Sequence, residues 1–234
     1  MPVDLHRKAD QPRQRLLDKD TATVSELASA LTDQDRKSAE RYVYWSDHGM
    51  LRTFWTNFGE VAPGVYRSNQ PDHDRLVKYK EMGIKAVLNL RGSPKKPHHI
   101  LEVRSCEMLG LELKSVALHA RAAPQVRHLN TLFEAFDSIQ RPFVMHCKSG
   151  ADRAGLAAVL YRLDQGEDIA QARQELSIKY LHLRHTKTGI QDHFIDTYQG
   201  RLKDGPISIR DWIAHEYDAK ALTESFAKVK RLPI

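Results

Sequence analysis

The segment Phe143-Val144-Met145-His146-Cys147-Lys148-Ser149-Gly150-Ala151-Asp152-Arg153-Ala154-Gly155 decides the fold of this 234-residue chain. The apolar run that ends at Met145 predicts a short buried strand. The residues from Ala154 to Leu163 are small or apolar with helical spacing, and they predict a helix. A tight loop of small residues joins the two, beginning with a cysteine and ending with an arginine.

The loop has the composition of an oxyanion site. Successive loop N–H groups can form a nest for an anion, and the following helix adds unpaired N–H donors and the positive end of its dipole. The guanidinium of Arg153 can give two parallel hydrogen bonds to phosphate oxygens. In this positive field we expect Cys147 to be held as a thiolate, placed for attack on phosphorus.

The pattern His146-Cys147-x5-Arg153 between a strand and a helix resembles the signature of the cysteine-dependent protein tyrosine phosphatases. It is most similar to the dual-specificity and bacterial dual-specificity-like branch, and the resemblance covers about Val61 to Tyr198. It implies that Cys147 is the nucleophile, that His146 supports the loop and that Arg153 clamps the phosphate. It also implies no metal and no cofactor. The implied phosphate-binding residues are Lys148, Ser149, Gly150, Ala151, Asp152 and Arg153.

The sequence departs from the family pattern at two places. The residue after the arginine is usually Ser or Thr, whose hydroxyl helps the thiolate leave, but here it is Ala154. The loop 117–124, where most members carry an aspartic general acid, has no carboxylate. Asp152 is the candidate acid, with an ion pair that orients Arg153 as the alternative. His119 is the second candidate, although an ordinary exposed loop histidine is the favoured interpretation.

The composition is that of a globular protein, with 41% hydrophobic and 28% charged residues. No apolar run is long enough to span a bilayer, and the first twenty residues lack the apolar core of a signal peptide. The two cysteines, Cys106 and Cys147, do not suggest a disulfide framework, so we expect a cytoplasmic protein in which Cys106 is a core thiol.

The net charge of +6 fits an anionic partner. No nucleic-acid motif, metal-ligand spacing or internal repeat is present in the sequence. We therefore expect the excess charge to help steer a phosphorylated protein or a small phosphorylated substrate, and we expect no nucleic-acid partner.

Strands and helices alternate along the chain, which predicts an α/β fold with a mainly parallel central sheet flanked by helices. We expect a mobile N-terminal arm over residues 1–35, an aromatic-rich segment over 36–60, the phosphatase domain over 61–200 and a C-terminal helical extension over 201–234. One helix is predicted at the C-terminus from Ile209, Ile213 and Tyr217, and another over 167–176. Arg91 and His119 follow predicted strands, so they are expected to face the same crevice as the Cys147 loop.

Six aromatic residues lie between Tyr42 and Phe58. They indicate either a surface for a partner or membrane, or a lid segment packed on the catalytic domain, and the second interpretation is favoured because aromatic side chains are mostly buried.

The favoured function is hydrolysis of phosphomonoesters through a cysteinyl-phosphate, with a phosphotyrosine or dual-specificity protein substrate. Lys148 resembles a position of phosphoinositide phosphatases, but their second loop lysine is replaced by Ala151. An inositol phosphate or phosphoinositide substrate therefore stays as an alternative. Because of Ala154 and the missing loop acid, a non-catalytic phosphate-binding protein is a further alternative. A rhodanese-type sulfurtransferase is disfavoured by Arg153.

Overall fold

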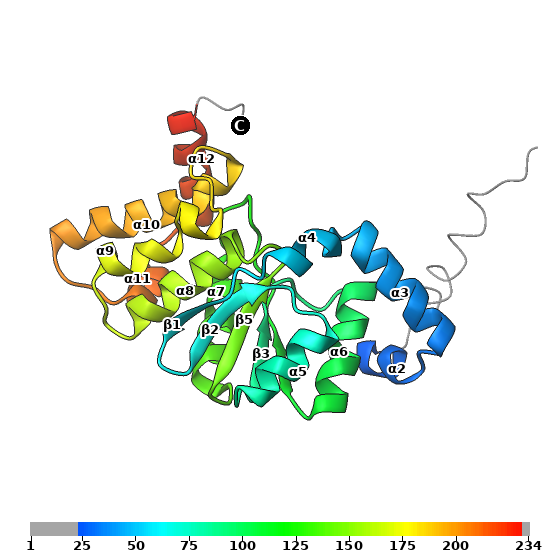
Figure 1. The fold of residues 1–234 in the computed structure, drawn as a ribbon. Coiled ribbons are helices and arrows are strands. Elements are labelled where there is room, and N and C mark those ends of the chain that lie inside the picture. The colour runs from blue at the N-terminus through cyan, green and yellow to red at the C-terminus, as the bar shows by residue number, and fades with distance from the viewer. Residues whose placement is uncertain (1–22, 231–234) are drawn as a thin grey trace, which may run out of the picture.

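The computed structural model describes residues 23–230 and has one five-stranded sheet. Its strand order is β1-β2-β5-β3-β4 (Figure 1). The pair β1 and β2 is antiparallel, and every other neighbouring pair is parallel. The prediction of a mainly parallel sheet is therefore confirmed. The strands are β1 (Gly59–Ala62), β2 (Val65–Asn69), β3 (Ala86–Asn89), β4 (Glu112–Ser115) and β5 (Phe143–Cys147).

The central strand β5 contributes side chains to the apolar cores on both faces of the sheet. Phe143 and Met145 join the larger apolar core, and Val144 between them joins the smaller core on the other face. This division follows from the two-residue period of a strand. A strand that is buried on both faces needs apolar residues at successive positions. This is why Phe143, Val144 and Met145 do not alternate with polar residues.

Helices cover both faces of the sheet (Figure 1). The smaller core holds side chains from α5 and α6, and the larger one holds side chains from α7, α8, α10, α11 and α12. The bounds are α5 (His73–Glu81), α6 (Pro97–Leu109), α7 (Val126–Ser138), α8 (Asp152–Asp164), α9 (Ile169–Ala172), α10 (Ile190–Arg201), α11 (Ile209–His215) and α12 (Ala219–Lys230). In place of the helix predicted over 167–176 stand the short α9 and a 3₁₀ turn, Arg173–Glu175.

The last part of the expected N-terminal arm over 1–35 forms helices in the structure, and residues 1–22 lie outside the described residues. Helix α2 (Val24–Ser29) begins with a capping box between Thr23 and Glu26. Leu27 and Ile100 lie together in a small apolar cluster between α2 and α6. Helix α3 (Asp33–Trp45) also packs on α6 and continues into α4 (Gly49–Phe54). The apolar side chains of α2 are therefore buried by docking on the domain.

The C-terminal region has two helices after α10 where the sequence predicted one. Tyr217 lies beyond the end of α11, and its hydroxyl donates a 2.8 Å hydrogen bond to the carbonyl oxygen of Pro124. Trp212 is buried against Phe194 and Tyr198. The aromatic packing ends one helix and allows α12 to start.

The aromatic-rich segment divides into buried and exposed parts. Phe58 stacks on Tyr66 and Tyr79, with ring centroids 5.4 and 5.2 Å away. Trp45 and Phe54 are 64% and 89% exposed. The segment therefore packs on the domain through one end and leaves apolar side chains at the surface.

Within residues 23–230, no helix combines the length and the apolar character that a membrane crossing needs.

The docking of α2 gives a stability prediction. Leu27→Ala, at a side chain 3% exposed, should lower the free energy of unfolding by about 2 kcal/mol, because it leaves a cavity against Ile100. Urea unfolding followed by circular dichroism measures this loss. The control is Leu51→Ala at a leucine 61% exposed, which should change the value by less than about 0.5 kcal/mol. Equal small effects in both variants would contradict the docking.

Candidate active site

The loop from Cys147 to Arg153 joins β5 to α8, as the sequence predicted. Cys147 is the last residue of β5 and is 1% exposed. Gly150 has a φ of +75°, and a Cβ there would lie 2.7 Å from the backbone nitrogen of Asn69. Only glycine fits this conformation and close approach. The amide of Gly150 donates to Cys147 Sγ at 3.2 Å, so the turn points an N–H group at the sulfur.

Arg67 of β2 holds the end of this loop from outside. Its Nη2 donates to the carbonyl oxygens of Gly150 and Ala151, the second at 3.2 Å. Its Nη1 donates to the carbonyl oxygen of Glu175 at 2.6 Å and to Oε2 of that residue at 2.8 Å. The guanidinium, fully buried, lies 3.7 Å from the ring centroid of Tyr180. A buried arginine with these partners is a rigid support.

The first half of the loop is held in the same way. The backbone N–H of Gln70 donates to the carbonyl oxygen of Lys148 at 3.4 Å. Asn57 Nδ2 donates to the carbonyl oxygen of Ser149 at 3.0 Å, and also to that of Tyr180. The four carbonyl groups from 148 to 151 are thus bound by groups outside the loop. Two of the loop amides stay inside the loop: Gly150 N–H donates to Cys147 Sγ and Ala151 N–H donates to Ser149 Oγ at 3.4 Å. Carbonyls bound from outside and amides kept inside are the arrangement that an anion-binding nest requires.

His146, expected to support the loop, is fully buried behind it. Its Nε2 lies 2.5 Å from Glu102 Oε1, and the second oxygen of Glu102 lies 3.2 Å from His99 Nδ1. Burial would raise the pKa of Glu102, but the two histidines outweigh it and lower that pKa to about 2. The ionised carboxylate of Glu102 is therefore buried beside His146, the residue that precedes Cys147, and it orients the imidazole ring.

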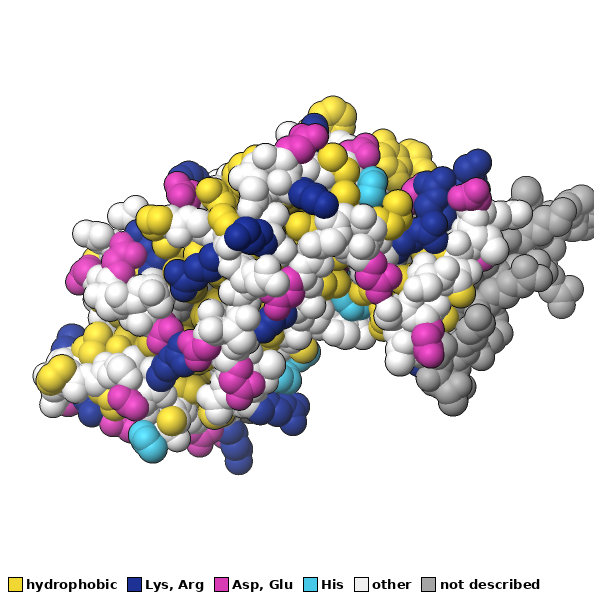
Figure 2. All heavy atoms as spheres, turned by 90° about the horizontal axis from the view of Figure 1, so that it is seen from below, with side chains coloured by type: hydrophobic (Ala, Val, Ile, Leu, Met, Phe, Trp, Pro, Cys, Tyr) yellow, Lys and Arg dark blue, Asp and Glu magenta, His cyan; other side chains and the backbone are white. Residues whose placement is uncertain are grey.

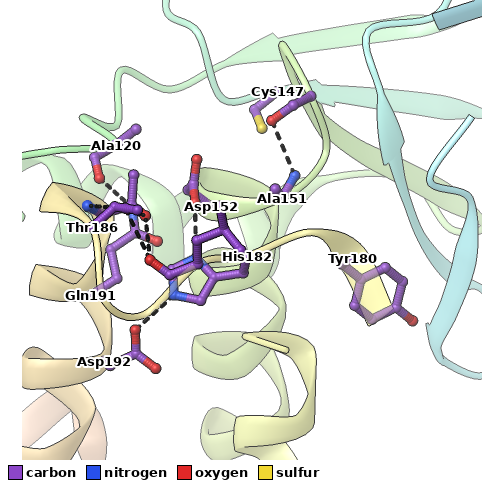
Figure 3. Close-up of polar contacts among 12 residues, drawn as sticks. Ala120, Cys147, Ala151, Asp152, Tyr180, His182, Thr186, Gln191 and Asp192 are labelled. Atoms are coloured by element: carbon purple, nitrogen blue, oxygen red, sulfur yellow. Dashed lines mark hydrogen bonds and ion pairs between the residues drawn. The ribbon is translucent and has the colours of Figure 1, made fainter. Parts of the chain in front are cut away.

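Asp152 forms an ion pair with His182 and not, as the alternative interpretation had it, with Arg153 (Figure 3). Its Oδ1 lies 2.8 Å from His182 Nδ1, and Asp192 Oδ2 lies 2.6 Å from the Nε2 of the same ring. Burial would lower the pKa of His182, but the two carboxylates raise it to about 9. At neutral pH the ring is an imidazolium between two carboxylates.

Arg153 itself makes no hydrogen bond or ion pair with any residue in the range 23–230, and its buried Nε has no partner. Its side chain thus keeps its donors for a ligand. Ala154, the residue that replaces the usual hydroxyl, is fully buried in the larger core.

The other candidates fall at different distances from the loop. Arg91 binds Asp47 through both guanidinium nitrogens at 2.9 Å, and Lys148 Nζ lies 3.5 Å from the same carboxylate, so Arg91 is connected to the loop. His119 is exposed and lies against His128, 5.8 Å between ring centroids. In the described part of the chain, no hydrogen bond or ion pair joins His119 to the loop.

Cys106 is a buried free thiol in the smaller core, as predicted. Burial raises its pKa strongly, and the nearby Glu102 and Glu107 raise it further. Cys147 belongs to the larger core, so the two sulfurs have separate surroundings.

Sequence reasoning missed the residues that hold the loop and its flanks. Arg67, Asn57 and His182 carry no local pattern that connects them to Cys147. Glu102 had a weak signal, because its spacing from His99 places both on one helix face. These contacts depend on the tertiary fold.

The buried His182 predicts a pH dependence of stability. Its pKa is raised from 6.5 to about 9 in the folded state, so its contribution is fully present below pH 6.5 and is lost as the pH rises through about 9. Unfolding free energies of the parent and of His182→Gln, measured in urea between about pH 6 and about pH 10, should differ most at the acid end and converge at the alkaline end. A difference that is constant with pH would contradict the imidazolium assignment.

Comparison with known proteins agrees with this geometry. Residues 61–167 match the family described as "Tc-R-P: Polymorphic toxin system, DSP-PTPase phosphatase". No curated protein matches the chain.

Solved structures show the same fold. A DUF442 phosphatase from Shewanella putrefaciens CN-32 is 21% identical, with a TM-score of 0.50 over 63% of this chain and 95% of that one. The core catalytic domain of the PP-IP phosphatase SIW14 from S. cerevisiae is 18% identical, with a TM-score of 0.50 over 64% and 92%. Residues 61–167, which include the Cys147–Arg153 loop, thus match a dual-specificity-like phosphatase family, and the solved structures share the fold.

Proposed function

We propose that this chain hydrolyses phosphomonoesters through a cysteinyl-phosphate intermediate on Cys147. The observation that carries the proposal is the outward attachment of the loop carbonyls to Arg67, Asn57 and Gln70. It holds the loop carbonyls away from the sulfur, at which the Gly150 N–H points, and preorganised amide donors of this kind stabilise the charge that develops on a transferring phosphoryl group.

In the proposed reaction, the Cys147 thiolate attacks phosphorus in line. A sulfur–phosphorus bond forms while the bond from phosphorus to the ester oxygen breaks, and the electron pair leaves with that oxygen. Arg153 and the loop amides bind the three non-bridging oxygens, and the amides from Lys148 to Asp152 supply the nest. Water then breaks the sulfur–phosphorus bond and releases phosphate and the thiolate. Without a hydroxyl at Ala154, this second step has less assistance than in relatives that carry one.

For Asp152 we propose a role as part of an ionised pair. Oδ1 of Asp152 is already bound to His182 Nδ1 at 2.8 Å, whereas a general acid must present its proton to the leaving oxygen of the substrate. Asp152, His182 and Asp192 then bind the start of α8 to the α9–α10 region. The acid role that the sequence predicted for Asp152 stays a prediction that the leaving-group experiment below tests.

The absence of an uncommitted acid in the loop bears on the substrate. A phenol leaves far more readily without protonation than an alkyl alcohol does, so the site suits an aryl phosphate such as phosphotyrosine. We propose a phosphotyrosine or dual-specificity protein substrate. The alternative, an inositol phosphate or phosphoinositide, is supported by Lys148 and Arg91 beside the loop. Parallel phosphate-release assays on a phosphotyrosine peptide and on inositol phosphates would separate the two substrate classes.

The nucleophile gives the first functional prediction. Cys147→Ser should remove turnover of nitrophenyl phosphate, a loss on the order of 10⁴-fold, while phosphate binding is kept because Arg153 and the nest survive. Steady-state release of nitrophenol and calorimetric titration with inorganic phosphate measure the two properties. The matched control is Cys106→Ser, the other buried cysteine, which should keep the parent rate once folded. Turnover that survives in Cys147→Ser would reject the cysteinyl mechanism, and a parent chain that binds phosphate without turnover would favour the non-catalytic alternative.

Asp152→Asn separates the two roles of the carboxylate. As part of an ion pair, its loss should lower kcat/KM for nitrophenyl phosphate and for an alkyl phosphate by similar factors, because both need the same loop. The ratio of the two values is the measurement, and His119→Ala is the control with both rates unchanged. A loss on the alkyl substrate that is larger by on the order of 10²-fold would show instead that Asp152 is the general acid.

A further inference from the structure

A cavity of about 580 Å³ lies outside the catalytic loop, between α3 and α4 on one side and α5 and α6 on the other. Its volume is within the range of small-molecule sites, roughly 300–1,000 Å³. Helices α3 and α4 precede residues 61–167, so this wall is not part of the matched family region.

Cationic side chains reach the cavity from all four helices: Arg36, Arg52, Arg75 and Arg104. Among the described residues, Arg36 pairs with Glu40 at 2.6 Å and Arg52 pairs with Asp47 at 3.1 Å. Arg104 donates to the backbone carbonyls of Ala28 and Leu31. Arg75 binds neutral groups, Asn69 Oδ1 and the carbonyl oxygen of Gln70, with Asp72 at 3.7 Å. Arg104 thus has no carboxylate within ion-pair distance among the described residues, and Arg75 has one at 3.7 Å, so positive charge at this part of the wall is in excess.

The wall toward the catalytic loop adds to this excess. The carboxylate of Asp47 forms ion pairs with three cations, with N···O distances of 2.9 Å to Arg91, 3.1 Å to Arg52 and 3.5 Å to Lys148. Burial lowers the pKa of Arg52, and repulsion by Arg91 and Arg75 lowers it further, although Asp47 opposes both. A second anion would relieve this repulsion.

Three nitrogen atoms of the cavity-lining residues have no hydrogen-bond partner among the described residues: Gln70 Nε2, Arg75 Nε and His98 Nε2. The side chains of Gln70 and His98 are 3% and 6% exposed. Buried nitrogen atoms of this kind are normally paired, so the three are available to the oxygen atoms of a ligand.

The remaining wall limits the ligand. The carboxylates that line the cavity have partners in the protein or lie in solvent. Glu40 binds Arg36, Asp72 caps α5, and Glu102 lies between two histidines. Asp74 is exposed. Apolar side chains cover another part of the wall: Val43, Tyr44, Leu76, Leu101 and Met108. The cavity therefore offers cations at one part and an apolar surface at another.

We propose that this cavity is a second ligand site, which binds a small phosphorylated organic molecule apart from the catalytic loop. The phosphate binds beside Arg52, Arg75 and His98, and the organic part packs on the apolar wall. Occupancy is communicated to the loop by two residues of the wall: Gln70, whose N–H binds the carbonyl of Lys148, and Glu102, which binds His146.

The test uses the full chain with its catalytic loop disabled, as Cys147→Ser/Arg153→Ala, and 1-naphthyl phosphate as the probe. Calorimetric titration should show saturable binding. Adding Arg75→Gln should weaken it by about tenfold or more, because a charge-assisted contact is lost. The control Arg173→Gln changes an arginine that binds Asp196 and Gln199 outside the cavity, and it should leave binding unchanged. Uncharged 1-naphthol should bind at least about tenfold more weakly.

No saturable binding to the folded, loop-disabled chain would overturn the proposal, and so would equal binding of 1-naphthol or equal affinity in Arg75→Gln. If Arg75→Gln does not fold, His98→Met takes its place with the same expected loss. The imidazole nitrogen signals of His98, followed by NMR in the loop-disabled chain, should shift with the same saturation curve as the heat. Since the catalytic loop is inactive throughout, failure here is independent of the phosphatase proposal.

Discussion

The structure depends on the binding of the phosphate-loop carbonyls by groups outside the loop. A backbone turn that points its N–H groups at one point needs its carbonyls to find partners elsewhere, because buried carbonyls without partners are costly. Arg67 supplies two of these contacts, Asn57 and Gln70 the others. Gly150 permits the turn and its close approach to β2. In the proposed anion site, the backbone is thus held in place before any anion arrives, which is the condition for electrostatic stabilisation of a transition state.

Buried groups of histidines and carboxylates lie on two sides of the loop. Glu102 binds His146 and His99 on one side of the loop, and His182 lies between Asp152 and Asp192 on the other. Breaking such a pair leaves an uncompensated buried charge, so these contacts restrain the geometry tightly. The arrangement also gives the carboxylate of Asp152 a partner, which leaves Arg153 as the loop's uncommitted charged side chain within the described residues.

The segment before the matched family region is part of the site. Asp47 binds Lys148 and Arg91, and Asn57 binds the loop itself. This segment also forms one side of the proposed second ligand cavity and leaves Trp45 and Phe54 exposed. A partner surface at Tyr42 to Phe58 therefore stays a proposal for the exposed residues, while Phe58 is committed to the domain. Substitutions in this segment are expected to act on the catalytic loop through contacts and not through the chemistry of the reaction.

Local sequence was enough to predict the strand, loop and helix around Cys147, because consecutive residues carry the apolar run, the glycine and the helical spacing. It was also enough for the parallel sheet, since alternating elements permit few topologies. Local sequence did not predict where each helix ends. The helix predicted through Tyr217 stops before this residue, whose hydroxyl binds the carbonyl oxygen of Pro124. Local sequence could not predict which residues bind the loop or support those that do. Arg67 and Glu175, for example, are 108 residues apart, and no local pattern indicates such a contact. Nor could the sequence tell that Asp152 faces His182 and not Arg153, because the direction of a side chain depends on what the fold places beside it.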